Sequence, residues 1–149
     1  MRTVVLGVGN TIMSDEGLGV HCVERLVESG ALPESVVAVD GGTSTHELLG
    51  DIEGIDLLVI VDAVVTGGAP GSLIRLEGDR IPAAFSNKLS PHQHGINDLL
   101  ATLQLVGRAP ARVVLHGVMP ARIELGMELS PEVEAVLPEL AARVLAEVM

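Results

Sequence analysis

The chain has 149 residues, a formal net charge of −11 and 48% hydrophobic residues, and Phe85 is its only aromatic residue. This length predicts one domain spanning residues 1–149, with a core of aliphatic side chains. The acidic balance argues against nucleic acid as a partner, because non-specific binding depends on Lys and Arg contacting phosphates. Cys22, the single cysteine, excludes an internal disulfide, and no apolar stretch is long enough to span a membrane. We therefore expect a cytoplasmic, soluble protein without a membrane partner.

Strand and helix patterns alternate along the chain. Apolar or alternating runs predict strands at 3–8, 35–40, 57–61, 72–77 and 112–116. Amphipathic patterns predict helices at 17–29, 45–52, 95–106 and 131–148. This order predicts the α/β class: a single three-layer α/β/α domain whose twisted, mostly parallel, mixed sheet is flanked by helices. The strand at 72–77 follows its predecessor without a helix, so it is expected to be antiparallel or at an edge.

The opening stretch VVLGVGNTIMSDEGLGV (4–20) begins like a dinucleotide-binding turn, with an apolar strand followed by Gly7 and Gly9. The third glycine of that fingerprint is missing. Asp15 and Glu16 also occupy the helix start where a pyrophosphate would bind, and their carboxylates would repel it. The loop therefore does not fit nucleotide binding.

Acidic residues and a histidine follow several of the predicted strands. Glu16, Asp40, Asp62 and His116 all come after apolar runs. In open α/β sheets, ligands bind beyond the carboxyl ends of the strands, so these residues are candidates for a site. Asp15 has a simpler explanation as a helix N-cap, because an acidic residue at a helix start also stabilises the helix dipole. Asp62 is equally consistent with a turn residue and with a ligand.

A histidine-containing segment, SPHQHG at 90–95, precedes the third predicted helix. His92 and His94 lack the HExxH spacing of zinc peptidases. Two carboxylates and an imidazole arriving from separate loops nevertheless suit a divalent ion such as nickel or zinc. No G-x-S-x-G elbow and no Cys–His pairing pattern offers a covalent nucleophile instead.

Together these motifs resemble the hydrogenase maturation endopeptidases, which trim a C-terminal extension from the large subunit of nickel–iron hydrogenases once nickel is in place. The resemblance covers the whole chain. It rests on GVGN and SDEGLGV within 7–20, DGGT at 40–43, VDA at 61–63, GGAPG at 67–71, SPHQ-x-G at 90–95 and LSPEV at 129–133.

The resemblance implies a nickel-binding set of Glu16, Asp62 and His92. His94 is an additional imidazole nearby, but the family's histidine precedes a glutamine, which favours His92. Catalytic roles are implied for Asp62 and Glu16, either of which could be the base if the metal polarises the scissile carbonyl or activates a water. The metal could equally serve only to dock the substrate. His116 is expected to be a structural histidine.

The implied activity is an endopeptidase that recognises nickel in a hydrogenase large-subunit precursor. The nickel would be supplied by that substrate and be absent from the resting protein, which is expected to be a monomer. Two other functions fit the same residues. One is a self-contained metal-dependent hydrolase that holds its own zinc, and the other is a non-catalytic assembly chaperone of the same pathway.

Overall fold

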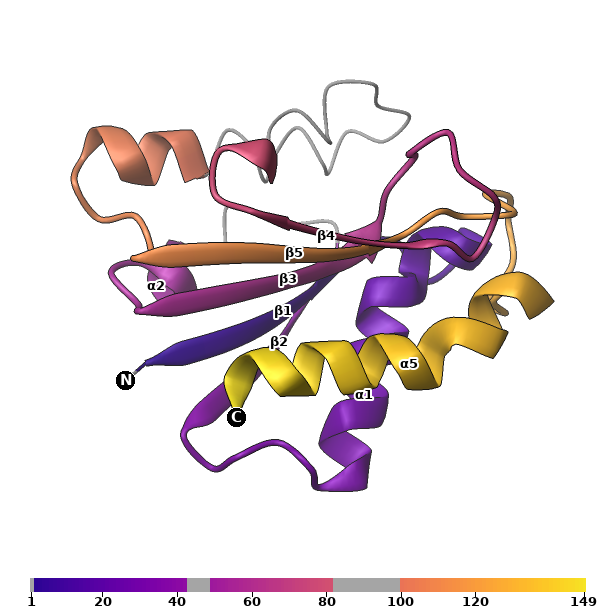
Figure 1. Cartoon of the computed structure of the whole chain (residues 1–149), viewed down its shortest axis with the longest axis horizontal. Helices are drawn as coiled ribbons and strands as arrows, with labels where there is room; N and C mark the ends of the chain where they lie inside the picture. The colour runs from indigo at the N-terminus through magenta and orange to yellow at the C-terminus, as the bar shows by residue number, and fades with distance from the viewer. Residues whose placement is uncertain (1, 43–48, 82–99) are drawn as a thin grey trace.

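The computed structural model describes residues 2–42, 49–81 and 100–149. These residues form a five-stranded sheet in the order β2-β1-β3-β5-β4 (Figure 1). The strands are β1 (Thr3–Val8), β2 (Val36–Gly42), β3 (Leu57–Ala63), β4 (Leu73–Glu77) and β5 (Arg112–Val118). Neighbouring strands are parallel except β4, which pairs antiparallel with β5. The α/β class with a mixed, mostly parallel sheet is confirmed.

Helices cover both faces of the sheet. The 3-10 helix η1 (Ser14–Gly17) leads into α1 (Leu18–Ser29), and α5 (Pro131–Val148) packs beside α1 on the same face (Figure 1). The opposite face carries α2 (Leu49–Ile52) and a helical segment at 100–105, through the buried side chains of Ile52 and Leu103. This is the predicted three-layer arrangement. No helix in the described part of the chain combines the length and apolar character needed to cross a membrane.

The central strand β3 shows why this sequence forms a covered parallel sheet. Every residue of its LLVIVDA run is buried. Leu58 and Ile60 contribute to the core on one face, whereas Val59 and Val61 contribute to the core on the other. An uninterrupted apolar run is typical of a parallel strand that has helices on both sides, since successive side chains point to opposite faces.

Three strands extend beyond their predicted ends, and β2 continues past Asp40 to Gly42. β3 was expected to stop before Asp62, but Asp62 pairs with Gly117 and the strand continues to Ala63. β5 likewise continues beyond His116 to Val118. The apolar pattern marks only the buried part of a strand, whereas the ladder continues as long as the partner strand offers backbone groups.

Local signals set the boundaries of the long helices. Ser130 is the N-cap of α5, where its hydroxyl accepts a hydrogen bond from Val133 N at 3.3 Å and Pro131 occupies the first helical position. α1 ends at Gly30, which adopts the left-handed conformation with φ of 70°. The helices predicted at 45–52 and 95–106 lie partly outside the described residues; 49–52 and 100–105 are helical.

Candidate functional site

The glycines of the opening motif allow the start of α1 to lie directly on the strand ends. A Cβ atom at Gly19 would lie 2.0 Å from the carbonyl oxygen of Val61, and one at Gly9 would lie 1.8 Å from that of Glu16. Gly9 also has a φ of 132°, which L-residues rarely adopt. The glycine spacing thus serves a close approach between backbones, and a phosphate is not needed to explain it.

This approach brings the two predicted carboxylates to one edge of the sheet. η1, which carries Glu16, contacts β3, which carries Asp62 near its carboxyl end. Asp62 is completely buried, and its Oδ1 accepts a hydrogen bond from Ala63 N at 2.8 Å. Glu16 is partly exposed. One carboxylate is therefore held rigidly within the strand end, and the other is open to an approaching molecule.

Asp15 does not have the role that its position suggested. Among the described residues, no side chain makes a capping hydrogen bond to η1 or α1, so the prediction of a helix-capping Asp15 is wrong. The residue is fully buried. Its Oδ2 accepts hydrogen bonds from Ala121 N at 2.8 Å and Arg122 N at 2.9 Å, and Ser130 donates from its amide and its hydroxyl. The carboxylate thus satisfies donors of the 119–130 loop and joins that loop to η1.

The remaining predicted site residues divide into two groups. His92 and His94 lie outside the described residues, so the imidazole of the predicted metal set stays a prediction. Asp40 is exposed on β2, where it pairs with Gly7. Within 2–42, 49–81 and 100–149, no group of three or more His, Cys, Asp or Glu side chains is arranged to hold a metal ion. A three-ligand site built on Glu16 and Asp62 therefore needs a ligand from elsewhere in the chain or from a bound partner.

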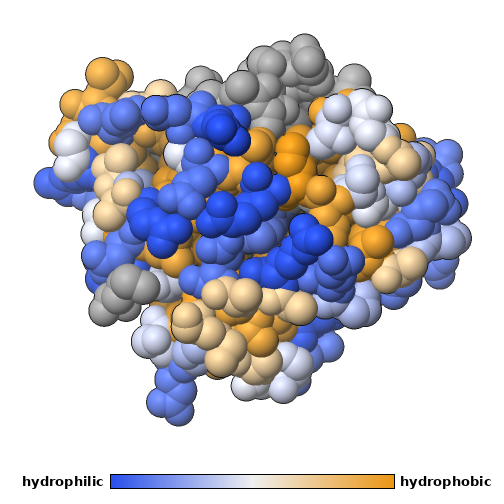
Figure 2. Space-filling view, viewed as in Figure 1, coloured by the Kyte–Doolittle hydropathy of each residue, from blue (hydrophilic) through white to orange (hydrophobic). Residues whose placement is uncertain are grey.

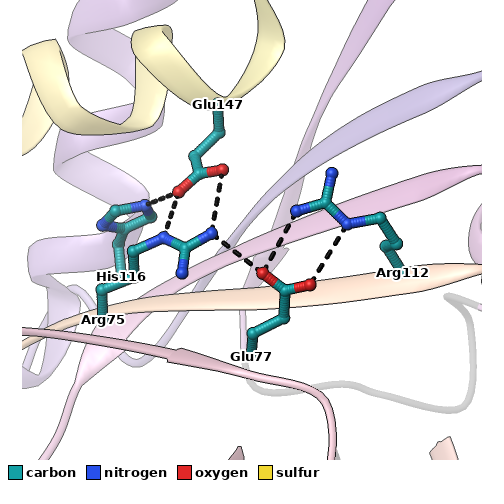
Figure 3. A network of polar contacts seen from close by, with 5 residues as sticks. All are labelled: Arg75, Glu77, Arg112, His116 and Glu147. Atoms are coloured by element: carbon teal, nitrogen blue, oxygen red, sulfur yellow. Dashed lines mark hydrogen bonds and ion pairs between the residues drawn. The ribbon is translucent and has the colours of Figure 1, made fainter.

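His116 belongs to a polar network between the sheet and α5 (Figure 3). Its Nε2 lies 3.0 Å from Glu147 Oε1, and Glu147 also pairs with Arg75. Arg75 in turn lies 3.0 Å from Glu77, which pairs with Arg112 at 3.1 Å. Figure 2 shows a hydrophilic band across this face of the molecule, over β4 and β5. His116 is thus a structural histidine with a partner, as expected.

Burial and ion pairing set the protonation of this network and of the lone thiol. Burial lowers the pKa of His116, although its hydrogen bond to Glu147 acts in the opposite direction. The hydrogen bond from Arg75 lowers the pKa of Glu147. Burial raises the pKa of the Cys22 thiol to about 12, so at neutral pH it is an un-ionised, apolar core side chain.

Comparison with known proteins gives this arrangement a family. The protein-family model described as HycI, hydrogenase maturation protease, matches residues 20–147 of this chain. The Hydrogenase 2 maturation protease of Escherichia coli (strain K12) is 44% identical over 147 residues, covering 98% of this chain and 90% of that protein.

Solved structures agree in fold. The hydrogenase maturating endopeptidase HybD from E. coli superposes with a TM-score of 0.93 at 43% identity, covering 99% of this chain and 91% of that one. The HybD protease from Thermococcus kodakarensis superposes with a TM-score of 0.84 at 28% identity over 100% of both chains. These matches place the chain in the class of peptidases. It belongs to the hydrogenase maturation protease family.

Proposed function

We propose that this protease removes the C-terminal extension of a nickel–iron hydrogenase large-subunit precursor, and that it recognises the nickel ion held in that precursor. Membership of the family supports peptidase activity in hydrogenase maturation. The observation that carries the nickel proposal is the packing of η1 against β3, which holds Glu16 and Asp62 at the same edge of the sheet.

The proposed ligands suit a nickel ion that is shared between the protease and the precursor. Carboxylate oxygens from Glu16 and Asp62 and an imidazole from His92 are ligands that bind nickel, but copper and zinc compete for the same atoms. No thiolate adds selectivity, because Cys22 is buried in α1. Selectivity is better obtained when the protease reads an ion already held by the precursor, and the partly exposed Glu16 is open to such an approach.

The two carboxylates suit different tasks. If the ion acts on the scissile bond as well as in docking, it would supply positive charge that polarises the neighbouring carbonyl. Asp62 is fully buried and accepts a hydrogen bond from Ala63 N, so it is suited to hold the ion in a fixed orientation. Glu16 is partly exposed and is suited to accept a proton from an attacking water. Both assignments are part of the proposal.

The proposal is tested by incubating the purified protein with nickel-loaded precursor and with apo-precursor and weighing the products. We expect one cut near the C-terminus of the nickel-loaded form and none in the apo form. Rapid cleavage of apo-precursor by zinc-reconstituted protein would instead identify a self-contained metalloprotease. Binding of the nickel-loaded precursor without cleavage would identify an assembly chaperone.

Asp62→Asn tests the ligand assignment within the same assay. The variant keeps the oxygen that accepts from Ala63 N, so it should fold normally and lose processing. Asp56→Asn is the matched control, because Asp56 directly precedes the same strand at its other end and is exposed. Full processing by a folded Asp62→Asn variant would contradict the assignment. His92→Ala and His94→Ala distinguish the two histidines, and only the first should lose processing.

A further inference from the structure

A group of exposed apolar side chains lies beside the candidate site. Ile12 is 49% exposed, Ile123 36%, Leu125 81% and Met127 71%; we call these residues the loop patch. Ile12 lies four residues before Glu16 in the chain, and the other three lie on the loop that follows β5. Figure 1 shows that loop, in orange, at the same end of the molecule as the start of α1. Adjacent exposed apolar residues of this kind are typical of protein-binding surfaces.

Backbone hydrogen bonds hold the two segments of the loop patch together. Gly126 N donates to Ile12 O at 2.9 Å, and Ser14 N donates to Gly126 O at 2.8 Å. Met13 and Gly126 are thereby paired as a parallel bridge. In that register Ile12 lies opposite Leu125, so their side chains share one face. The patch is therefore a preorganised surface that can bind without a large ordering cost.

The loop after β5 also makes hydrogen bonds to Ser14 and Asp15, the two residues that precede Glu16. Ser14 has a φ of 52°, a left-handed conformation that costs a non-glycine residue about 1 kcal/mol or more. Its hydroxyl donates to Glu124 O at 2.8 Å, and Asp15 accepts hydrogen bonds from Ala121 and Arg122 of the same loop. A partner that contacts the patch thus contacts the loop that holds η1 and Glu16 in place.

A hollow of about 360 Å³ adjoins the patch at Met127. It is lined by His21, Arg25, Met127, Glu128, Leu129 and Glu134. Nε2 of His21 is buried and has no hydrogen-bond partner in the described part of the chain. The hollow therefore provides space beside an apolar surface.

We propose that the loop patch and its hollow form the surface on which the folded large-subunit precursor docks. This inference rests on the proposed function, because it assigns the binding surface for that substrate. The patch is continuous with η1, so a protein bound there would reach Glu16. Exposed Glu124 and Glu128 border the patch, Glu124 lying 3.6 Å from Arg122, and the whole chain carries a net charge of −11. The matching surface of the precursor should be apolar with a border of Lys and Arg.

Charge also disfavours a second copy of this chain as the occupant. A symmetric dimer through the loop patch would bring the exposed Glu128 close to its own copy. Like charges placed opposite one another suppress association. A basic partner meets no such penalty.

The test is the steady-state processing of nickel-loaded precursor by a Leu125→Ser/Met127→Ser variant. Both side chains are mostly exposed, so the melting temperature should stay close to that of the original protein. We expect the KM to rise about tenfold or more and kcat to stay within about twofold, because docking contacts are lost and the reacting groups are unchanged. The matched control is Leu105→Ser/Val106→Ser, which removes exposed apolar side chains near the amino ends of the strands and should change neither constant.

Each outcome bears on the proposal. An unchanged KM in the double variant, or an equal rise in the control, overturns it. A dimer in the original protein that the double substitution converts to a monomer assigns the patch to a second copy and also overturns it. If the double variant fails to fold, Met127→Gln is measured in the same way. If the original protein does not cut the precursor, the proposed function fails, and the precursor affinities of original and variant proteins decide the docking proposal separately.

Discussion

Ser130 makes two hydrogen bonds to Asp15: its amide donates to Oδ1 and its hydroxyl to Oδ2, both at 2.7 Å. The same hydroxyl accepts from Val133 N in the first turn of α5. One serine therefore connects the start of the last helix to the carboxylate beside Glu16. The link joins segments that are 115 residues apart, and it positions the site through buried polar contacts.

Asp15→Asn should lower the free energy of unfolding by about 3 kcal/mol, because an amide NH₂ would then face backbone donors in a buried position. Ser130→Ala should cost less, about 1–2 kcal/mol, since the carboxylate keeps its backbone donors. Urea denaturation of both variants measures the difference. Equal losses, or none, would contradict the view that the carboxylate organises this loop.

Gly19→Ala should destabilise the protein far more than the size of a methyl group implies. The new Cβ would lie 2.0 Å from Val61 O and 2.8 Å from Val8 O, so α1 must move away from the strand ends. We expect a loss of about 3 kcal/mol or more, with reduced processing because η1 moves as well. Gly50→Ala is the control, since a Cβ there meets no atom within 4 Å. Its melting temperature should be unchanged or higher.

The His116 network should make the protein less stable in mild acid. Burial lowers the pKa of His116 below its ordinary value of 6.5, and the hydrogen bond from Arg75 lowers that of Glu147 below 4.5. As the pH falls, the unfolded chain takes up a proton at His116 first and at Glu147 later, while the folded protein resists both. The unfolded state then binds more protons, so folding stability decreases.

His116→Gln isolates the first of these steps. The glutamine amide can still donate to Glu147 but does not titrate, so the variant should lose less stability than the original protein between about pH 7 and about pH 5. Glu147→Gln is the complementary variant: it should flatten the profile at lower pH and, because it removes the group that raises the pKa of His116, steepen the loss between about pH 7 and about pH 5. Chemical denaturation at each pH provides the measurement. Parallel profiles for the original protein and His116→Gln would show that this histidine does not contribute.

The sequence predicts those parts of the molecule that depend on local patterns. The apolar run of β3, the Ser130-Pro131 start of α5 and the burial of Cys22 all appear as expected. The edge position of β4 also follows from the missing crossover helix. In each case the physical cause lies within a few neighbouring residues.

Long-range contacts determine the features that local sequence patterns did not predict. The partners of Asp15 come from residues more than 100 positions away, so no local pattern distinguishes it from a helix cap. The extension of β3 past Asp62 depends on pairing with β5. The family resemblance implied that Glu16 and Asp62 act together. The packing of η1 on β3 gives the physical reason why the two residues lie near each other.

The origin of the metal leads to the last prediction. Glu16 and Asp62 are held by backbone packing and by hydrogen bonds within the protein, such as that from Ala63 N to Asp62. The fold is built on aliphatic cores on both faces of the sheet. A resident metal would stabilise the folded state by an amount that grows with its affinity, and its removal would lower the melting temperature.

We therefore expect the protein to purify largely free of metal and to keep its melting temperature in excess chelator. Metal analysis of the purified protein and thermal unfolding with and without chelator measure this directly. Asp62→Asn, which removes one proposed ligand, is the control. If no metal is bound, chelator should leave the melting temperature of this variant unchanged, as in the original protein. A stoichiometric ion in the purified protein, together with a chelator-induced fall in melting temperature that Asp62→Asn abolishes, would show that the metal is resident and does not arrive with the precursor.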